Sequence, residues 1–188
     1  MGLHDFTIYD VINLNARCYK QRPAWLEVAD GREITFGQLK DVVDHLAKGL
    51  QDAGLNKGDR IGLMGKNSLE YFLLFGAASA LGLIVLPINW RLSAEEAGNN
   101  LADGAPRIVF ADQEYQELIE GLKGRLSSVE RYYNLSGGGS FQDLNELFDN
   151  DADFSPVEVC TDDGAVIIHT AAIEGKPRGA LLSHGNFL

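Results

Sequence analysis

The sequence predicts an α/β fold in which a mostly parallel sheet carries helices on both faces, with a small β-hairpin near the N-terminus. Three observations favour this class. Short apolar runs typical of buried strands alternate with segments whose apolar residues recur at helical spacing. Several of the helical segments begin with a capping box. An Asp-Gly pair lies between two short alternating runs and indicates the hairpin.

The N-terminal part of the chain is expected to hold one helix and the hairpin. The helix should begin at a capping box formed by Thr7 and Asp10 and run to about Tyr19. Two alternating runs, residues 25–28 and 34–36, flank the Asp-Gly pair, which is typical of a tight turn. These features predict an antiparallel hairpin after the first helix.

The middle of the chain alternates between helices and strands. A long amphipathic helix over residues 36–53 should end at Gly54. Asn67 with Glu70 should cap an apolar helix that ends at Leu81. The further expected elements are strands at 60–64, 83–88, 107–111 and 131–135, a helix starting at Ser93 with Glu96, and helices at 115–122 and 141–148. This alternation is typical of a parallel sheet covered by helices.

Composition limits the class of protein. With 188 residues, 45% of them hydrophobic, the chain can bury one sizeable core, so a single globular unit is expected. The net charge of −11 and the lack of Lys and Arg clusters argue against a nucleic-acid partner. Cys18 and Cys160 fit no CxxC or Cys/His pattern, which predicts no metal site and a reducing, cytoplasmic location.

Two segments allow other interpretations. Residues 69–88 are about as long as a membrane span, but Glu70, Gly82 and Pro87 favour a helix, a turn and a strand, so no transmembrane segment is expected. Residues 149–163 carry six acidic residues and no basic one, which predicts a solvated linker. Their start is similar to a calcium loop, but the glycine and the final acid that such a loop requires are missing.

A loop rich in glycine and basic residues joins two apolar strands, 165–169 and 180–183, near the end of the chain. Residues 170–179 can place backbone N–H groups and cationic side chains around a polyphosphate. The loop is not of the Walker type, because a proline follows its lysine where Ser or Thr is required. From the loop alone, a tight connection with solvated Lys176 and Arg178 is an equally good interpretation.

The segment resembles the signature of the adenylate-forming superfamily, which includes acyl-CoA synthetases, luciferases and peptide-synthetase adenylation domains. The family pattern is Tyr-Thr-Ser-Gly-Thr-Thr-Gly-x-Pro-Lys-Gly, followed by a strand and Thr/Ser-His-x-Asn. The matching residues are Thr170, Gly175, Pro177, Gly179, His184 and Asn186, and Arg178 keeps the charge of the family's lysine. Further landmarks lie upstream in the family's order, at residues 34–36, 58–60, 67–68, 85–89 and 91–92. The resemblance covers essentially the whole chain.

The resemblance implies that residues 1–188 are an incomplete N-terminal part of an AMP-binding domain, in a ligase of the acyl-CoA synthetase or fatty-acid–CoA ligase type. Such an enzyme uses ATP and Mg²⁺ to convert a carboxylic acid into an acyl-adenylate and passes the acyl group to coenzyme A. The ATP-binding residues implied are Thr170, Gly175, Lys176, Arg178 and Gly179. His184 and Asn186 are expected to shape the start of the next helix.

The resemblance also sets limits on what this chain can do alone. The catalytic residues are expected beyond residue 188, so the fragment alone should be inactive as a ligase. A sheet that lacks its remaining neighbours exposes unpaired edges and apolar side chains, which predicts self-association of the fragment.

The loop departs from the family pattern at residues 171–174, where Ala-Ala-Ile-Glu replaces Ser-Gly-Thr-Thr. A carboxylate about 4 Å from a phosphate charge opposes binding by about 4 kcal/mol at an effective dielectric near 20. Three interpretations stay open: Glu174 turns away from the phosphates, acts through Mg²⁺, or marks a loop that has lost its grip on triphosphate. The alternative function is therefore a noncatalytic nucleotide-binding or regulatory relative with a degenerate phosphate loop.

Overall fold

The computed structural model describes residues 6–28, 30–151, 154, 157–170 and 178–187. The helices are α1 (Ile8–Cys18), α2 (Phe36–Asp52), α3 (Leu69–Leu81), α4 (Ala94–Gly104) and α5 (Gln113–Leu122), with 3-10 helices η1 (Lys123–Arg125), η2 (Leu144–Phe148) and η3 (His184–Asn186). The strands are β1 (Pro23–Leu26), β2 (Glu33–Thr35), β3 (Arg60–Met64), β4 (Ile84–Pro87), β5 (Ile108–Ala111), β6 (Arg131–Asn134), β7 (Gln142–Asp143), β8 (Gly164–Thr170) and β9 (Arg178–Ser183).

Seven strands form one sheet in the order β7-β6-β5-β3-β4-β8-β9. All neighbours from β7 to β8 are parallel, and only β9 runs antiparallel, beside β8. Strands β1 and β2 form a separate antiparallel hairpin. The predicted α/β class, with a mostly parallel sheet and a small N-terminal hairpin, is confirmed.

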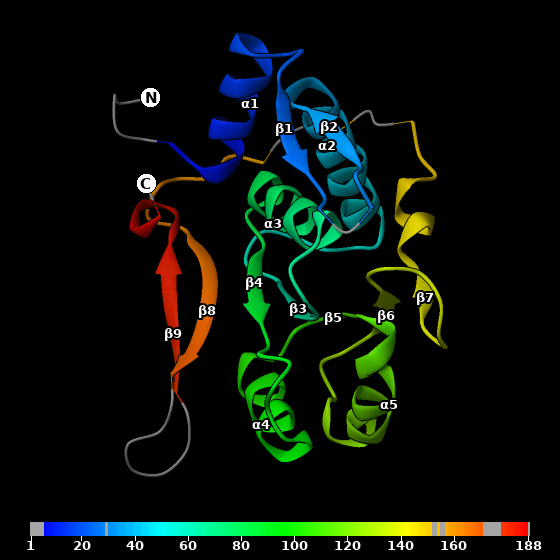
Figure 1. Cartoon of the computed structure of the whole chain (residues 1–188). Coiled ribbons are helices and arrows are strands. Elements are labelled where there is room, and N and C mark those ends of the chain that lie inside the picture. The colour runs from blue at the N-terminus through cyan, green and yellow to red at the C-terminus, as the bar shows by residue number, and fades with distance from the viewer. Residues whose placement is uncertain (1–5, 29, 152–153, 155–156, 171–177, 188) are drawn as a thin grey trace.

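Helices cover both faces of the sheet (Figure 1). Helices α1, α2 and α3 lie on one face, where Leu46, Leu74 and Phe110 belong to the larger apolar core. Helices α4 and α5 lie on the other face, where Leu101 and Ile119 belong to a second core. All five side chains are fully buried, and burial of such a side chain contributes about 1.5–3 kcal/mol. The central strands are therefore held between two apolar layers.

Side-chain hydrogen bonds start most helices where the sequence predicts. Capping boxes are present at α1, α2 and α4, so those expected at the first and the third of these helices are confirmed. Helix α3 differs, because Ser68 rather than Asn67 is its N-cap and accepts from the Tyr71 N–H at 3.2 Å. The Glu70 side chain, expected to complete the Asn67 cap, instead pairs with Arg32 at 2.7 Å.

The segment 141–148 was expected to be a helix, and the structure bears this out only for Leu144–Phe148, which form the 3-10 helix η2. Gln142 pairs with Tyr133 in the short strand β7, and the Asp143 side chain accepts from the Asn145 N–H at 2.9 Å. That local bond turns the chain into the 3-10 helix η2, since Asp competes with a regular helix for backbone groups. Among the helices of the described residues, none combines the length and the apolar character needed to cross a membrane.

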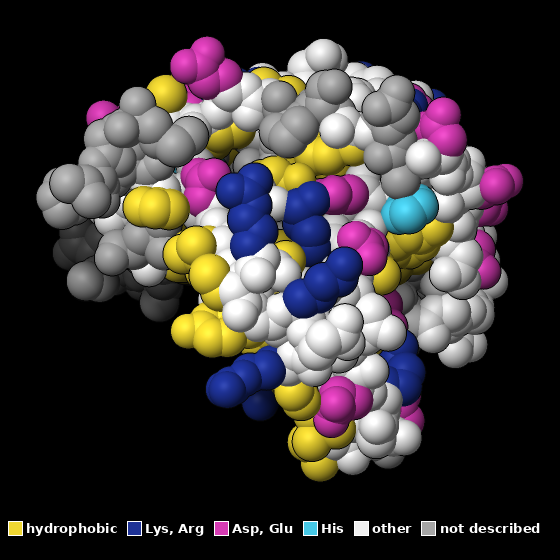
Figure 2. Space-filling model, turned by 90° about the horizontal axis from the view of Figure 1, so that it is seen from above, with side chains coloured by type: hydrophobic (Ala, Val, Ile, Leu, Met, Phe, Trp, Pro, Cys, Tyr) yellow, Lys and Arg dark blue, Asp and Glu magenta, His cyan; other side chains and the backbone are white. Residues whose placement is uncertain are grey.

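Basic and acidic side chains are interspersed on the face over α1, α2 and the β1–β2 hairpin (Figure 2). Ion pairs also occur within these elements: Lys40 of α2 pairs with Asp44, and Arg32, which follows the hairpin turn, pairs with both Asp30 and Glu70. Such partly exposed pairs contribute about 1 kcal/mol or less each. Several cations of these elements are therefore balanced by neighbouring acids.

Strand β9 forms an edge of the sheet, because its only strand partner among the described residues is β8. Ile168 of β8 is 41% exposed and Leu181 of β9 is 58% exposed. Exposed apolar residues on a six-residue edge strand are a template for pairing with another chain. Self-association of the chain stays a prediction, and this edge is where we expect it to occur.

We expect Leu181→Lys to weaken self-association of the 188-residue chain by about tenfold, because a charge on an edge strand opposes pairing between copies. Sedimentation at rising concentration measures the effect. Leu14→Lys is the matched control, since Leu14 is 50% exposed but lies on helix α1, away from any strand edge. A wild-type chain that stays monomeric at high concentration would contradict the expectation.

Candidate functional site

The β8–β9 hairpin carries the loop that the sequence singles out. Its ladder runs from Gly164 opposite Ser183 to Thr170 opposite Arg178. The ladder therefore places Thr170 and Arg178, the described residues that flank segment 171–177, opposite each other at one end of the hairpin (Figure 1). Thr170 and Arg178 are both exposed there.

Only part of the predicted site falls within the described residues. Thr170, Arg178 and Gly179 are described, and the ladder brings all three together. The other two expected ATP-binding residues, Gly175 and Lys176, lie outside the described residues, and so does Glu174.

Arg178 is one of several cations that form no ion pair within the described residues. Arg107 pairs with Asp59 at 2.7 Å and with Glu130 at 2.8 Å. Arg178, in contrast, makes no ion pair within the described part of the chain. The Arg178 side chain is exposed, and an arginine guanidinium can bind phosphate oxygens in a bidentate manner.

Gly179 has a packing reason to be glycine. It lies opposite His169 in the ladder. A Cβ atom there would stand 2.8 Å from Ile167 Cγ2 and 3.2 Å from His169 Nε2. A side chain at position 179 would thus push the two strands apart close to the loop.

His169 and Asp103 form a contact that the sequence did not suggest. The His169 side chain is only 3% exposed, and its Nε2 lies 2.9 Å from Asp103 Oδ2. Asp103 lies in the last turn of α4, which contains no basic residue. An acid at that end of a helix is disfavoured by about 0.3–1 kcal/mol. The acidic Asp103 at the C-terminal end of this helix was the one feature of the sequence that could have pointed to the contact with His169.

The comparison with known families decides the assignment. The model of the family described as AMP-binding enzyme matches residues 13–188. The chain belongs to this family. The resemblance to the adenylate-forming superfamily, of the acyl-CoA ligase type, is confirmed.

Individual relatives agree with the family. A fatty acid–[acyl-carrier-protein] ligase, ScoC of Streptomyces coeruleorubidus, is 30% identical over 182 residues, which are 96% of this chain and 34% of the relative. A feruloyl-CoA synthase of Amycolatopsis is 31% identical over 157 residues, or 83% of this chain and 29% of the relative. The chain spans about a third of the length of these curated relatives.

A crystal structure from Rhodopseudomonas palustris, assigned provisionally as a long-chain-fatty-acid CoA ligase, matches with a TM-score of 0.90 and 40% identity. The match covers 98% of this chain and 46% of that chain. The chain therefore has the fold of the N-terminal part of AMP-binding enzymes, as the sequence predicted.

In this AMP-binding enzyme chain, the residues after β9 shape the backbone, as expected. The Asn186 side chain accepts from the Ser183 N–H at 3.0 Å. The His184 N–H donates to the Asp163 carbonyl at 3.1 Å, and the His184 side chain is fully buried. Burial lowers the pKa of His184, and the nearby Asp163 carboxylate only partly opposes this. His184 thus fastens the end of β9 to the segment before β8.

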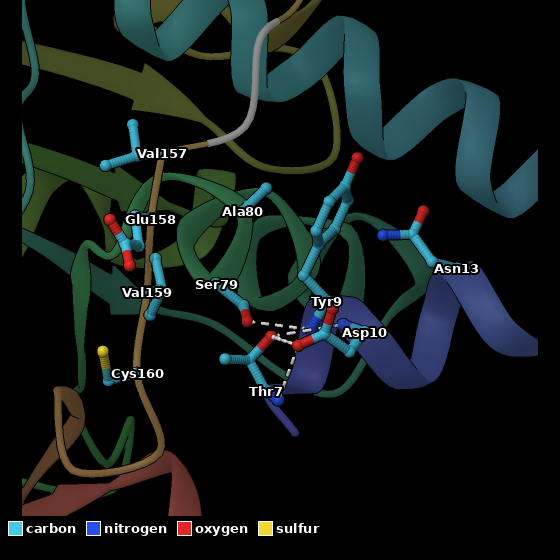
Figure 3. A pocket seen from close by; sticks show the side chains of 10 residues that line it. All are labelled: Thr7, Tyr9, Asp10, Asn13, Ser79, Ala80, Val157, Glu158, Val159 and Cys160. Atoms are coloured by element: carbon cyan, nitrogen blue, oxygen red, sulfur yellow. Dashed lines mark hydrogen bonds between the residues drawn. The ribbon is translucent and has the colours of Figure 1, made fainter. Parts of the chain in front are cut away.

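A cavity of about 350 Å³ lies between α1, α3 and segment 157–160 of the AMP-binding enzyme chain (Figure 3). Its polar side chains serve local structure: the Tyr9 N–H donates to Ser79 Oγ at 2.9 Å, and the Thr7 N–H donates to Asp10 at 2.9 Å. Within the described ranges, no three His, Cys, Asp or Glu side chains are grouped as metal ligands. The hydrogen bond from Tyr9 to Ser79 therefore ties α1 to α3, and the free thiol of Cys160 is among the side chains that line the cavity.

Proposed function

We propose that the chain is the N-terminal part of an ATP-dependent carboxylate–CoA ligase, and that the loop on the β8–β9 hairpin binds the phosphates of ATP. One observation carries the proposal. The hairpin holds the ends of the signature loop together with Thr170 and Arg178 exposed, and Arg178 has no acidic partner among the described residues. The family of the chain supports the same assignment.

The reaction explains why such a loop is needed. A carboxylate is a poor electrophile until one of its oxygens becomes a good leaving group. Attack of the carboxylate oxygen on the α-phosphorus of ATP forms the acyl-adenylate and releases pyrophosphate. The negative charge that develops on the departing phosphates needs positioned donors. The Thr170 hydroxyl and the Arg178 guanidinium are the described groups of the loop that can donate to them.

The proposal includes Mg²⁺ and coenzyme A in the complete protein. Mg²⁺ would shield the phosphate charge, and it is usually bound by one or two carboxylates together with the substrate phosphates. Its arrival with ATP fits the described residues, which hold no ready group of acidic ligands. Transfer of the acyl group to coenzyme A and the identity of the carboxylic acid depend on segments other than the hairpin.

The ligase activity is tested on the complete protein by exchange of labelled pyrophosphate into ATP in the presence of a broad panel of carboxylic acids. Acid-dependent exchange is expected, because formation of the adenylate is reversible. The 188-residue chain alone is expected to show none. Lack of exchange with every acid would contradict the proposal.

We expect Arg178→Ala to weaken ATP binding to the 188-residue chain by about tenfold or more, since a hydrogen bond to a charged group contributes about 1.5–3 kcal/mol. A titration followed by amide NMR shifts measures the dissociation constant. Arg17→Ala is the control, because it removes one exposed cation from α1, at the other end of the molecule from the loop. Equal affinity of both variants would exclude Arg178 from the site.

A second function is favoured by the departures at residues 171–174. A noncatalytic relative with a degenerate loop would bind ATP poorly. In that case we expect the double change Ile173→Thr with Glu174→Thr to restore binding by up to about a thousandfold, because it removes a charge that opposes phosphate. The same titration measures it. Tight binding by the unchanged chain would rule out this function.

A further inference from the structure

His169 occupies a special position at the base of the proposed phosphate loop. It directly precedes Thr170 and lies opposite Gly179 in the β8–β9 ladder. Its ring packs against the Gly179 Cα so closely that a Cβ atom at 179 would come within 3.3 Å of two ring atoms. The imidazole therefore contacts both strands of the hairpin one step before the loop begins.

Asp103 fixes the orientation of this ring. Asp103 Oδ2 lies 2.9 Å from His169 Nε2, so the carboxylate accepts a hydrogen bond from a ring that carries its proton on Nε2. The second ring nitrogen, Nδ1, is buried and has no hydrogen-bond partner within the described residues. The carboxylate of Asp103 is thus the described group that sets the tautomer and the rotation of the ring.

Helix α4 gives this contact a rigid support. Asp103 belongs to α4, which packs against β9 and lies beside the hairpin (Figure 1). The same end of α4 is held to the sheet by Arg60, which donates to the Gly104 carbonyl at 3.0 Å and to the Ala105 carbonyl at 2.7 Å. A contact between residues 103 and 169 therefore ties the hairpin to a firmly anchored helix end.

We propose that Asp103 and His169 form a positioning pair that holds the two ends of the phosphate loop in register. The pair acts through the ring, which contacts Gly179 on one strand while its own backbone leads into Thr170 on the other. Neither residue need touch the nucleotide. The value of the pair for ATP binding rests on the proposed function, whereas its effect on the hairpin does not.

Asp103→Ala tests the pair in the 188-residue chain. Removing an acid from this helix end favours the folded state, whereas losing the hydrogen bond to the nearly buried His169 ring disfavours it, so thermal stability should change little or fall slightly. We expect the His169 ring to lose its single tautomer in ¹⁵N NMR spectra. We also expect amide exchange in β8 and β9 to accelerate by about tenfold, and the ATP dissociation constant to rise by about tenfold.

Two further variants serve as controls. Glu95→Ala removes one exposed acid from the first turn of α4, at the opposite end of the helix from Asp103. This change should leave the tautomer of the His169 ring, the amide exchange of β8 and β9 and the ATP affinity unchanged. Asp103→Glu keeps the carboxylate and should restore part of all three properties. If Asp103 only stabilised α4, Asp103→Ala would change the thermal stability and leave the tautomer of the His169 ring unchanged.

The outcomes separate this inference from the proposed function. If Asp103→Ala leaves tautomer and amide exchange as in the wild type, the positioning pair is refuted, whatever happens to ATP. If both change but the wild-type chain binds no ATP, the pair is supported and the proposed phosphate site is refuted. If the wild-type chain binds ATP and the Asp103→Ala chain binds it equally well despite faster exchange, the pair has no part in positioning the loop.

Discussion

Replacement of Gly49 by alanine is expected to destabilise the protein by about 2 kcal/mol or more. Gly49 lies in α2, where a Cβ atom would stand 1.9 Å from the Leu147 carbonyl oxygen and 2.7 Å from its carbonyl carbon. Both are backbone atoms of η2, so no side-chain rotation can relieve the contact. Leu46 and Leu50 on either side are fully buried, so α2 cannot shift without opening the core.

Two opposing effects decide the sign of this change. Alanine favours a helix over glycine by about 1 kcal/mol, whereas overpacking a close-packed interior costs about 1–3 kcal/mol and more against backbone. The clash outweighs the propensity. The midpoint of urea unfolding, followed by circular dichroism, measures the net effect.

Gly121→Ala is the matched control for Gly49→Ala. Gly121 is exposed in α5, and a Cβ atom there would meet nothing within 4 Å. Only the higher helix propensity of alanine applies at this position, so Gly121→Ala should stabilise the protein by about 0.5–1 kcal/mol. A Gly49→Ala protein as stable as the wild type would show that η2 does not lie against α2.

The stability of the protein is expected to fall as the pH decreases from about 6.5 towards the lowered pKa of His184. The side chain is fully buried, and neither ring nitrogen has a hydrogen-bond partner within the described residues. Burial lowers the pKa of His184 in the folded protein below its ordinary value near 6.5. The unfolded chain therefore binds the proton better.

The sign follows from this difference in proton affinity. The stability contributed by the neutral ring is complete above the unfolded pKa and is lost as the pH falls below it, towards the folded pKa. The lowered pKa of Asp163, which arises from its hydrogen bond with the Cys160 N–H and its pairing with Lys57, acts below its ordinary value near 3.8, outside this window. Urea unfolding at a series of pH values measures the dependence.

His184→Leu should remove most of the pH dependence in that window while keeping an apolar side chain of similar size in the buried site. Asp10, Asp163 and Lys57 are the charged groups that influence His184, and they remain in place in this variant. Equal slopes in the wild type and the His184→Leu protein would contradict the assignment.

Much of the fold could be predicted from sequence because its elements depend on local patterns. The strand at residues 60–64 was predicted with the bounds that β3 has. A short apolar run that follows a clearly amphipathic helix is typical of a buried strand. The capping boxes at Thr7 and Ser93 act within four residues and were predictable for the same reason. The prediction of a helix over residues 141–148 was correct only in part, because the Asp143 side chain redirects the backbone there.

The candidate site was predictable only in part. Thr170 and Arg178 were found through the loop signature, which is a local feature of the sequence. The contact between Asp103 and His169 joins residues 66 positions apart and depends on how α4 packs beside β9. Likewise, the need for glycine at position 49 arises from η2, almost 100 residues later. Such contacts depend on tertiary packing, which no local pattern records.

The attachment of β8 to the sheet has a consequence for the dynamics of the hairpin. Strand β8 joins β4 through the pairing of Val166 with Val85, a contact between distant parts of the chain, whereas β3, β4 and β5 follow one another closely. Contacts distant in sequence form late in folding, because closing a long loop costs entropy first. We therefore expect the β8–β9 hairpin to join the sheet after the three central strands have paired.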